Sequence, residues 1–179
     1  ASMCDLAGIK PTYGRVSRAG VVPLSFSLDN VGPLTRTVED NAIMLTAISG
    51  HDPRDPASAR AKVTDFTIDL DKGVKGLKIG LVRHFYDTDL KAQAEMAASI
   101  DTAAETLRKL GATVEEMAMS PLSEYAAVNR VILLSEAFAI HEKWLQDRPE
   151  YYAHFTRERL MPGAFIRATQ YVQAMRHRE

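Results

Sequence analysis

Apolar residues recur at steps of three or four in several stretches of the chain, and this spacing predicts amphipathic helices. The predicted helices run from Val38 to a stop at Gly50 and over 89–111, 122–146 and 164–179. Thr37, with Asp40 three residues later, is typical of a helix N-cap. The apolar stripes consist of Val38, Ala42, Leu45 and Ile48; Ala92, Met96, Ile100, Ala103, Leu107 and Leu110; Ala127, Val131, Leu134, Phe138 and Leu145; and Phe165, Ala168, Val172 and Met175.

Shorter apolar runs predict strands. The runs at 77–82 and 113–119 flank the helix predicted over 89–111, so 77–119 is expected to be a β-α-β unit with a right-handed crossover and parallel strands. Gly20 to Leu24, and the alternation of Leu24, Phe26 and Leu28, indicate short strands in an otherwise irregular segment over 1–36. The predicted fold class is α/β, a mixed sheet with helices on both faces.

Turn-forming residues divide the chain into three parts. Residues 1–50 contain closely spaced glycines and prolines and are expected to form a wrapped scaffold. Residues 51–72 are predicted to be a loop or hinge, and the Asp-Pro pairs at 52–53 and 55–56 indicate that 51–60 is exposed. Residues 73–179 carry the β-α-β unit and the later helices.

Composition narrows the class of protein. Of 179 residues, 46% are hydrophobic, 25% are charged and the formal net charge is −1, which predicts a cytoplasmic protein without direct nucleic-acid or membrane binding. The single cysteine, Cys4, is consistent with a reducing compartment and is expected to be a buried small hydrophobe. The five histidines have no metal-ligand spacing, so no metal site is predicted, and His141 is expected to be packed on its helix with its polar edge satisfied locally.

A complete nucleophilic centre is not evident within these residues. Ser2, Ser17, Ser25 and Ser27 are available, but none lies in a Gly-x-Ser-x-Gly turn or in a loop rich in glycine and serine that could form an oxyanion pocket.

Three motifs at fixed spacing carry a family resemblance: GIKPTYGRVSR from Gly8, SLDNVGP from Ser27 and TRTVED from Thr35. Together they resemble the amidase signature family. The resemblance implies an α/β/α core and amide hydrolysis or transamidation through a serine acyl-enzyme. It places the nucleophile, a second serine in a cis peptide and a lysine upstream of Ala1. Residues 1–179 are then expected to be a partial amidase domain, inactive alone, that needs no cofactor and acts on a small-molecule amide.

The resemblance also suggests site residues. In related amidases the helix that corresponds to 164–179 lies near the cleft, and in amidotransferase members an arginine there grips the substrate carboxylate, a role that Arg178 fits best. The simpler interpretation of Arg178 is a favourable charge at a helix C-terminus. Asn129 is expected to line the cleft. Lys10 and Arg15 are expected to anchor carbonyls and carboxylates around the site, with Asp29 as a partner for one of them.

Other interpretations stay open at this point. The chain could be a non-catalytic scaffold or partner module that complements a separate N-terminal piece, and the substrate amide is not identified by the sequence. A small ligand-binding domain built on 77–119 is disfavoured, because no glycine-rich phosphate loop opens the helix after Val82. Without upstream strands and helices, an open sheet edge and exposed apolar surface would favour homo-oligomers.

Overall fold

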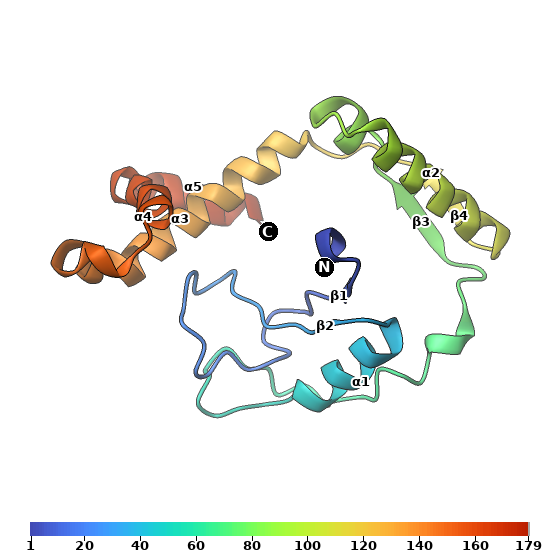
Figure 1. Ribbon diagram of the computed structural model, residues 1–179, viewed down its shortest axis with the longest axis horizontal. Helices are drawn as coiled ribbons and strands as arrows, with labels where there is room; N and C mark the ends of the chain where they lie inside the picture. The colour runs from blue at the N-terminus through green and yellow to red at the C-terminus, as the bar shows by residue number, and fades with distance from the viewer. Residues whose placement is uncertain (179) are drawn as a thin grey trace. The chain divides into compact units, whose positions relative to one another are not determined.

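The computed structural model describes residues 1–178, apart from the side chain of Ser2. It contains two compact units. The first unit consists of Ala1–Asp71 and Val131–Gln173, and the second of Lys72–Arg130 and the residues from Ala174 on. The segments of each unit can be followed by colour in Figure 1.

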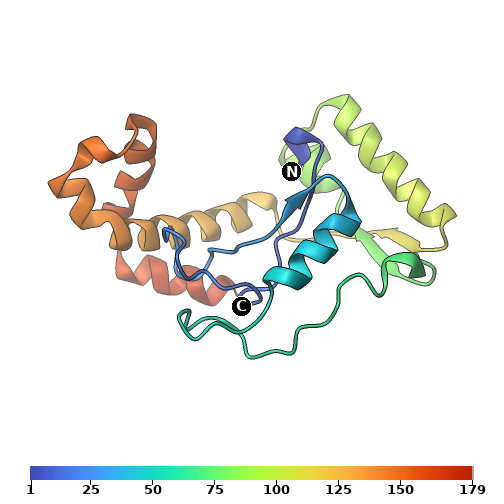
Figure 2. The same ribbon diagram turned by 60° about the horizontal axis from the view of Figure 1, so that its bottom comes forward.

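The N-terminal part of the first unit is a long irregular chain with a small sheet and one helix. Strand β1 (Ala7–Gly8) pairs antiparallel with β2 (Leu34–Thr35), and helix α1 (Val38–Ile48) packs beside both strands (Figure 2). The Thr37 hydroxyl accepts a hydrogen bond of 3.0 Å from the amide of Asp40, so the predicted N-cap is confirmed. The cap satisfies an amide group that the helix itself cannot pair.

Helices make up the rest of the first unit. Helix α3 (Leu122–Asp147) enters it at Val131 and is followed by a 3-10 turn (Pro149–Tyr151), helix α4 (His154–Leu160) and a 3-10 segment (Met161–Phe165). Helix α5 (Ala168–Arg178) comes last and belongs to this unit as far as Gln173. These elements form the orange and red end of the chain in Figure 1. Their buried core consists of Ala137, Leu145 and Leu160, against which Phe138 and Tyr152 pack.

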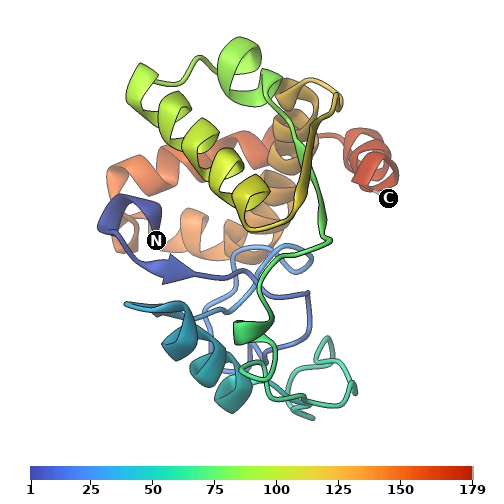
Figure 3. The ribbon, with the colours of Figure 1, turned by 90° about the vertical axis from the view of Figure 1, so that its right-hand side faces the viewer.

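The second unit contains the predicted β-α-β arrangement. Strand β3 (Lys78–Leu81) pairs parallel with β4 (Thr113–Glu116), and helix α2 (Ala94–Lys109) lies on this pair (Figure 3). The core consists of Ala104, Ala112 and Val114, packed by Val74, Ile79, Leu81 and Leu107. Gly111 has a φ of 95°, a left-handed conformation that ends the helix and that glycine adopts without strain.

The sheet content is smaller than the sequence pattern indicates. Among the described residues the strands form one antiparallel and one parallel pair, and the remainder is mainly helix, which is consistent with the α/β class. The strands predicted between Gly20 and Leu28 are absent. Turns occupy this segment, because Asp29 pairs with local backbone amides in place of a neighbouring strand. A π-helical turn (Phe85–Asp89) precedes α2, which begins later than predicted.

Two burial predictions were wrong, and a third holds only in part. Cys4 is exposed, since it lies in a 3-10 turn beside Met3, whose exposed fraction is 98%. The loop at 51–60 is not wholly exposed, because Asp55 and Ser58 are buried by hydrogen bonds. The predicted helix stripes are confirmed only in part, because Ala42 and Leu45 of α1 and Leu145 of α3 are buried, whereas Val38, Met96, Leu110, Phe165 and Val172 are exposed. The buried residues are Ala104 in α2; Ile132, Glu136, Ala137, His141 and Leu145 in α3; and Ala174 in α5.

Candidate functional site

A tight turn at 24–29, whose last three residues begin the SLDNVGP motif, supports the site. The carboxylate of Asp29 accepts hydrogen bonds of 2.8 and 3.0 Å from the backbone amides of Leu24 and Ser25. The carbonyl of Ser25 in turn accepts from the amides of Leu28 and Asp29. A carboxylate that bonds to nearby backbone amides stabilises such a turn. Asp29 therefore closes this turn.

Glu136 holds the same turn from helix α3. Its Oε2 accepts from the Ser25 hydroxyl at 2.5 Å and from the Ser27 amide at 2.9 Å. Its Oε1 accepts from the Ser27 hydroxyl at 2.7 Å and from the Tyr171 hydroxyl of α5 at 2.8 Å. The residue is 6% exposed, and these donors use the acceptor positions that a carboxylate offers.

The pKa of Glu136 reflects this environment. Burial acts to raise the pKa, but the hydrogen bonds from Ser25, Ser27 and Tyr171 favour the charged form and lower it below its usual range. Glu136 is therefore a carboxylate at neutral pH. Because its acceptor positions are already filled, it is suited to fix the turn and unsuited to take a proton from a substrate.

A cavity of about 410 Å³ lies beside this cluster. Its lining residues are Phe26, Ser135, Glu136, Ala139, Gly163, Ile166, Ala168 and Tyr171. The volume falls within the range of roughly 300–1,000 Å³ that is usual for small-molecule sites. Its mainly apolar wall with a polar margin suits an apolar group attached to a hydrogen-bonding one.

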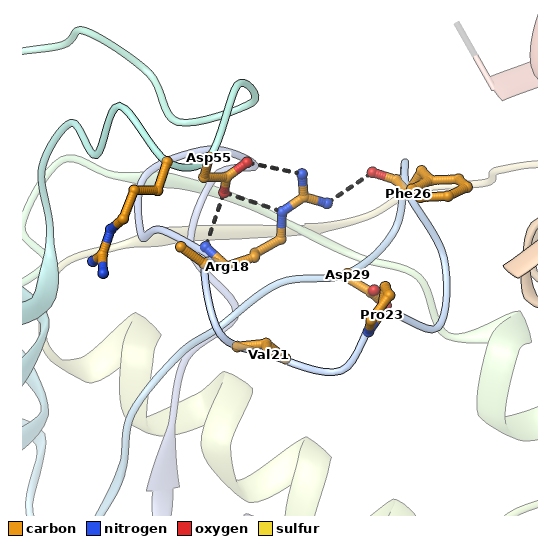
Figure 4. A pocket seen from close by; sticks show the side chains of 8 residues that line it. Arg18, Val21, Pro23, Phe26, Asp29 and Asp55 are labelled. Carbon is orange, nitrogen blue, oxygen red and sulfur yellow. Dashed lines mark hydrogen bonds and ion pairs between the residues drawn. The ribbon is translucent and has the colours of Figure 1, made fainter.

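A smaller cavity of about 150 Å³ lies beside the same turn, with Phe26 and Asp29 among its lining residues. Asp55 accepts from the Arg18 amide at 2.8 Å, and its other oxygen lies 3.3 Å from Arg18 Nη2 (Figure 4). These bonds from Arg18, which outweigh burial, lower the pKa of Asp55. Both arginines that line it are already paired, Arg18 with Asp55 and Arg54 with Asp52, and its volume is below that of usual ligand sites, so this cavity is the weaker candidate.

Phe26 contributes to the walls of both cavities. Its carbonyl accepts hydrogen bonds of 2.6 Å from the Tyr13 hydroxyl and 2.8 Å from Arg18 Nη1, the latter visible in Figure 4. The exposed fraction of Phe26 is 59%, which is high for a large aromatic residue in a turn anchored on both sides. The turn thus presents an aromatic ring at the rim of the larger cavity.

The predicted anchors occupy other parts of the structure. Lys10 Nζ donates to the Pro11 carbonyl at 3.2 Å, and Arg15 Nη1 donates to the Lys62 carbonyl at 3.2 Å. Both contacts agree with the predicted bonding to loop carbonyls. Asp29 pairs with neither, because backbone amides within its own turn lie closer along the chain, so the predicted partnership is wrong.

Asn129 and Arg178 are exposed residues of the second unit, on α3 and in the last turn of α5. The residues that line the two cavities of the first unit do not include them. Their assignment to substrate binding stays a prediction.

Neither Ser17 nor Ser25 is paired with a base suited to activate it. The Ser25 hydroxyl donates to a carboxylate of lowered pKa, and Ser17 donates to Asp52 at 2.9 Å, whose pKa is also lowered, mainly by Arg54. The side chain of Ser2 lies outside the described part. Within residues 1–178, no group of three or more histidine, cysteine, aspartate or glutamate side chains is placed to hold a metal ion.

His141 is packed, as predicted, but only one of its two ring contacts is near in the chain. Its Nδ1 lies 2.8 Å from the Tyr152 hydroxyl and its Nε2 lies 3.0 Å from the Pro23 carbonyl. Since a carbonyl can only accept, Nε2 carries the proton, and the bond to Pro23 joins α3 to the segment that leads into the 24–29 turn.

The sequence interpretation missed Glu136, Tyr171 and the Arg18–Asp55 pair. Glu136 had a usable signal, because it is the only charged residue in the apolar run 131–140. Buried charges need partners, and hydroxyl donors are abundant at 25–27. Nothing in the local pattern indicates Tyr171.

Comparisons with known proteins agree with the motifs. A family model described as Amidase matches residues 1–178. An amidase from Pseudomonas putida is 41% identical over 99% of this chain and 38% of its own length. A glutamyl-tRNA(Gln) amidotransferase subunit from Staphylococcus saprophyticus is 38% identical over 97% of this chain and 39% of its own length. The chain thus spans about two fifths of the length of these relatives.

Solved structures share the fold. A structure described as an unexpected vestigial protein complex that reveals the origins of an s-triazine catabolic enzyme has a TM-score of 0.85 and 31% identity, covering 98% of this chain and 37% of its own. The peptide amidase of Stenotrophomonas maltophilia has a TM-score of 0.73 and 29% identity, covering 94% of this chain and 39% of its own. With a family match that spans nearly every residue, this chain belongs to the amidase family.

Proposed function

We propose that this chain forms scaffold and part of the substrate wall of an enzyme that hydrolyses carboxylic amides through a serine acyl-enzyme. The observation that carries the proposal is the cavity of about 410 Å³, whose rim is formed by Phe26 of the motif-bearing turn. An apolar wall beside hydroxyl and carboxylate groups suits a small-molecule amide with an apolar substituent.

The chemistry is assigned to residues upstream of Ala1. The engagement of Ser17 and Ser25 with carboxylates of lowered pKa supports this assignment, because a serine nucleophile needs a base that can take its proton. The 179-residue chain alone is therefore expected to be inactive. Arg178 and Asn129 are proposed to contact substrate, and Lys10, Arg15 and Asp29 to support the scaffold.

The cellular location of the enzyme and its need for a cofactor are part of the same proposal. The enzyme is proposed to act in the cytoplasm without a cofactor. None of the helices in the described part of the chain has the length and apolar character needed to cross a membrane. Exposed large apolar side chains, among them Phe155, Phe165 and Trp144, support self-association of the isolated chain.

The test compares two proteins, the 179-residue chain and the same protein extended upstream to its natural start. Both are assayed for hydrolysis of a panel of simple amides and of glutamine, and both are treated with a serine-directed fluorophosphonate. We expect turnover and labelling in the extended protein alone. Activity and labelling of the short chain would contradict the placement of the nucleophile.

Glutamine in this panel addresses a second candidate function. The similarity to a protein named as an amidotransferase subunit favours a role as one component of a multi-chain enzyme. Turnover of glutamine in preference to simple amides supports that role, whereas inactivity of both proteins toward every amide supports a non-catalytic scaffold or partner module.

A further inference from the structure

Glu136 differs from Asp55, which is also buried, because its partners are neutral donors whereas Asp55 is paired with Arg18. Glu136 is 6% exposed, and its carboxylate accepts hydrogen bonds from the neutral donors Ser25, Ser27 and Tyr171. Burying a charge is costly, and a carboxylate in such a place persists only when strong hydrogen bonds compensate. The donors at this turn supply that compensation, so the turn and the carboxylate are held together.

The bonds to Glu136 connect segments far apart in the chain. They join helix α3 to the 24–29 turn, 109 and 111 residues earlier, and to α5, 35 residues later. Both Glu136 and Tyr171 line the larger cavity, so the carboxylate fixes two of its walls with respect to one another.

The turn is also fixed on its opposite side. Tyr13 and Arg18 donate to the carbonyl of Phe26, while Glu136 accepts from the residues immediately before and after it. The ring of Phe26 is therefore carried on a backbone that is held at three consecutive residues. Removal of the bonds on one side would leave the ring free to move into or away from the cavity.

We infer that Glu136 is a positioning residue for amide substrates. It acts through Ser25 and Ser27 to hold Phe26 at the rim of the larger cavity, and so it sets substrate affinity without taking part in bond breaking. This inference rests on the proposed amide hydrolysis and adds a specific residue to it.

Glu136→Gln in the protein extended upstream to its natural start tests the inference. Glutamine keeps the size of the side chain and one acceptor oxygen, but it lacks the charge, so the bonds from the Ser27 amide and the surrounding hydroxyl groups become weaker. We expect KM for amides to rise at least tenfold while kcat changes less than threefold. Hydrogen exchange of the peptide that contains the Ser27 amide should accelerate at least tenfold.

Two further variants complete the design. Glu142→Gln changes an exposed glutamate of the same helix and should leave both KM and exchange at wild-type values. Ser27→Ala removes one hydroxyl bond while the Ser27 amide stays paired, and it should produce an intermediate change in both readouts. Ser27→Ala also tests the inference if Glu136→Gln does not fold.

The outcomes separate this inference from the proposed function. If the wild-type protein turns over no amide, the proposed function fails, and unchanged exchange in Glu136→Gln would overturn the positioning of the turn as well. If the wild type is active and KM is unchanged in Glu136→Gln, the inference is overturned even when exchange accelerates. A loss of kcat with unchanged KM would also overturn it, because it would indicate a part in the chemistry.

Discussion

Carboxylates in the first unit are stabilised by hydrogen bonds that come largely from the backbone and from hydroxyl groups. Asp29 accepts from two backbone amides, Glu136 from hydroxyl groups and an amide, and Asp55 from the amides of Arg18 and Ala57 as well as from the Arg18 guanidinium. Bonds to a charged acceptor are stronger than bonds between neutral groups. At the scale of single residues, the irregular segments of this unit depend on these acceptors.

Asp29→Ala tests that dependence. The substitution leaves the amides of Leu24 and Ser25 without their acceptor, so we expect the free energy of unfolding to fall by about 1–3 kcal/mol. Thermal unfolding followed by the fluorescence of Trp144, the single tryptophan, would report the loss. Asp29→Asn retains one acceptor oxygen and should lose less, and an unchanged melting temperature in Asp29→Ala would refute the role.

At the scale of elements, the 3-10 segment Met161–Phe165 packs on helix α3 with Gly163 against the backbone of that helix. Gly163 is buried, and a Cβ atom there would clash with the carbonyl oxygen of Leu134 and lie 2.5 Å from the Cβ of Phe138. Glycine is therefore required by contact with the backbone of a neighbouring helix. The same contact places Gly163 in the wall of the larger cavity.

Gly163→Ala should separate these elements. Overpacking against a backbone carbonyl is expected to cost about 1–3 kcal/mol of unfolding free energy, measured by urea unfolding with Trp144 fluorescence. Ala164→Ser, at the exposed neighbouring position, should change stability by less than about 0.5 kcal/mol. Equal stability of the two variants would show that the segment adjusts without cost.

For the whole molecule, several carboxylates with lowered pKa make stability depend on pH. The pKa values of Asp55 and Glu136 are lowered in the folded chain, so each adds stability above its unfolded pKa and loses it as pH falls through the folded pKa. The pKa values of Asp65, Asp89 and Asp101 shift in the same direction through their hydrogen bonds. Acidification should therefore destabilise the fold.

We expect the urea midpoint of Trp144 fluorescence to fall continuously from about pH 5 downwards, because the unfolded carboxyl groups take up protons near pH 4 and the folded ones only at lower pH. Trp144 belongs to the first unit, which also contains Asp55 and Glu136. A variant with Asp55→Asn and Glu136→Gln should be less stable at neutral pH and should depend less steeply on pH, because neither substituted side chain titrates. A midpoint that is flat or that rises on acidification would contradict the hydrogen-bonding account.

The amino-acid sequence by itself determined the elements whose signals are local. Helical spacing located α1 and α3 closely, the Thr37–Asp40 cap located the start of α1, and two apolar runs around a helix identified the parallel β3–β4 pair. The motifs also identified the family. These signals succeed because a helix period, a cap and a strand run depend on residues within a few positions of one another.

Only the tertiary structure decided which helix faces are buried and where the candidate site lies. Periodicity indicated Leu134, Phe138 and His141 as part of the inner face of α3, yet Glu136 is also buried there because Ser25 and Ser27 provide donors from a distant part of the chain. The packing of His141 was predicted, but its partner Pro23 was not. Likewise, the segment 20–28, which was predicted to contain strands, forms turns, one of which is closed by Asp29. A polar group can be buried only when its partner is present, and that depends on contacts that local spacing does not encode.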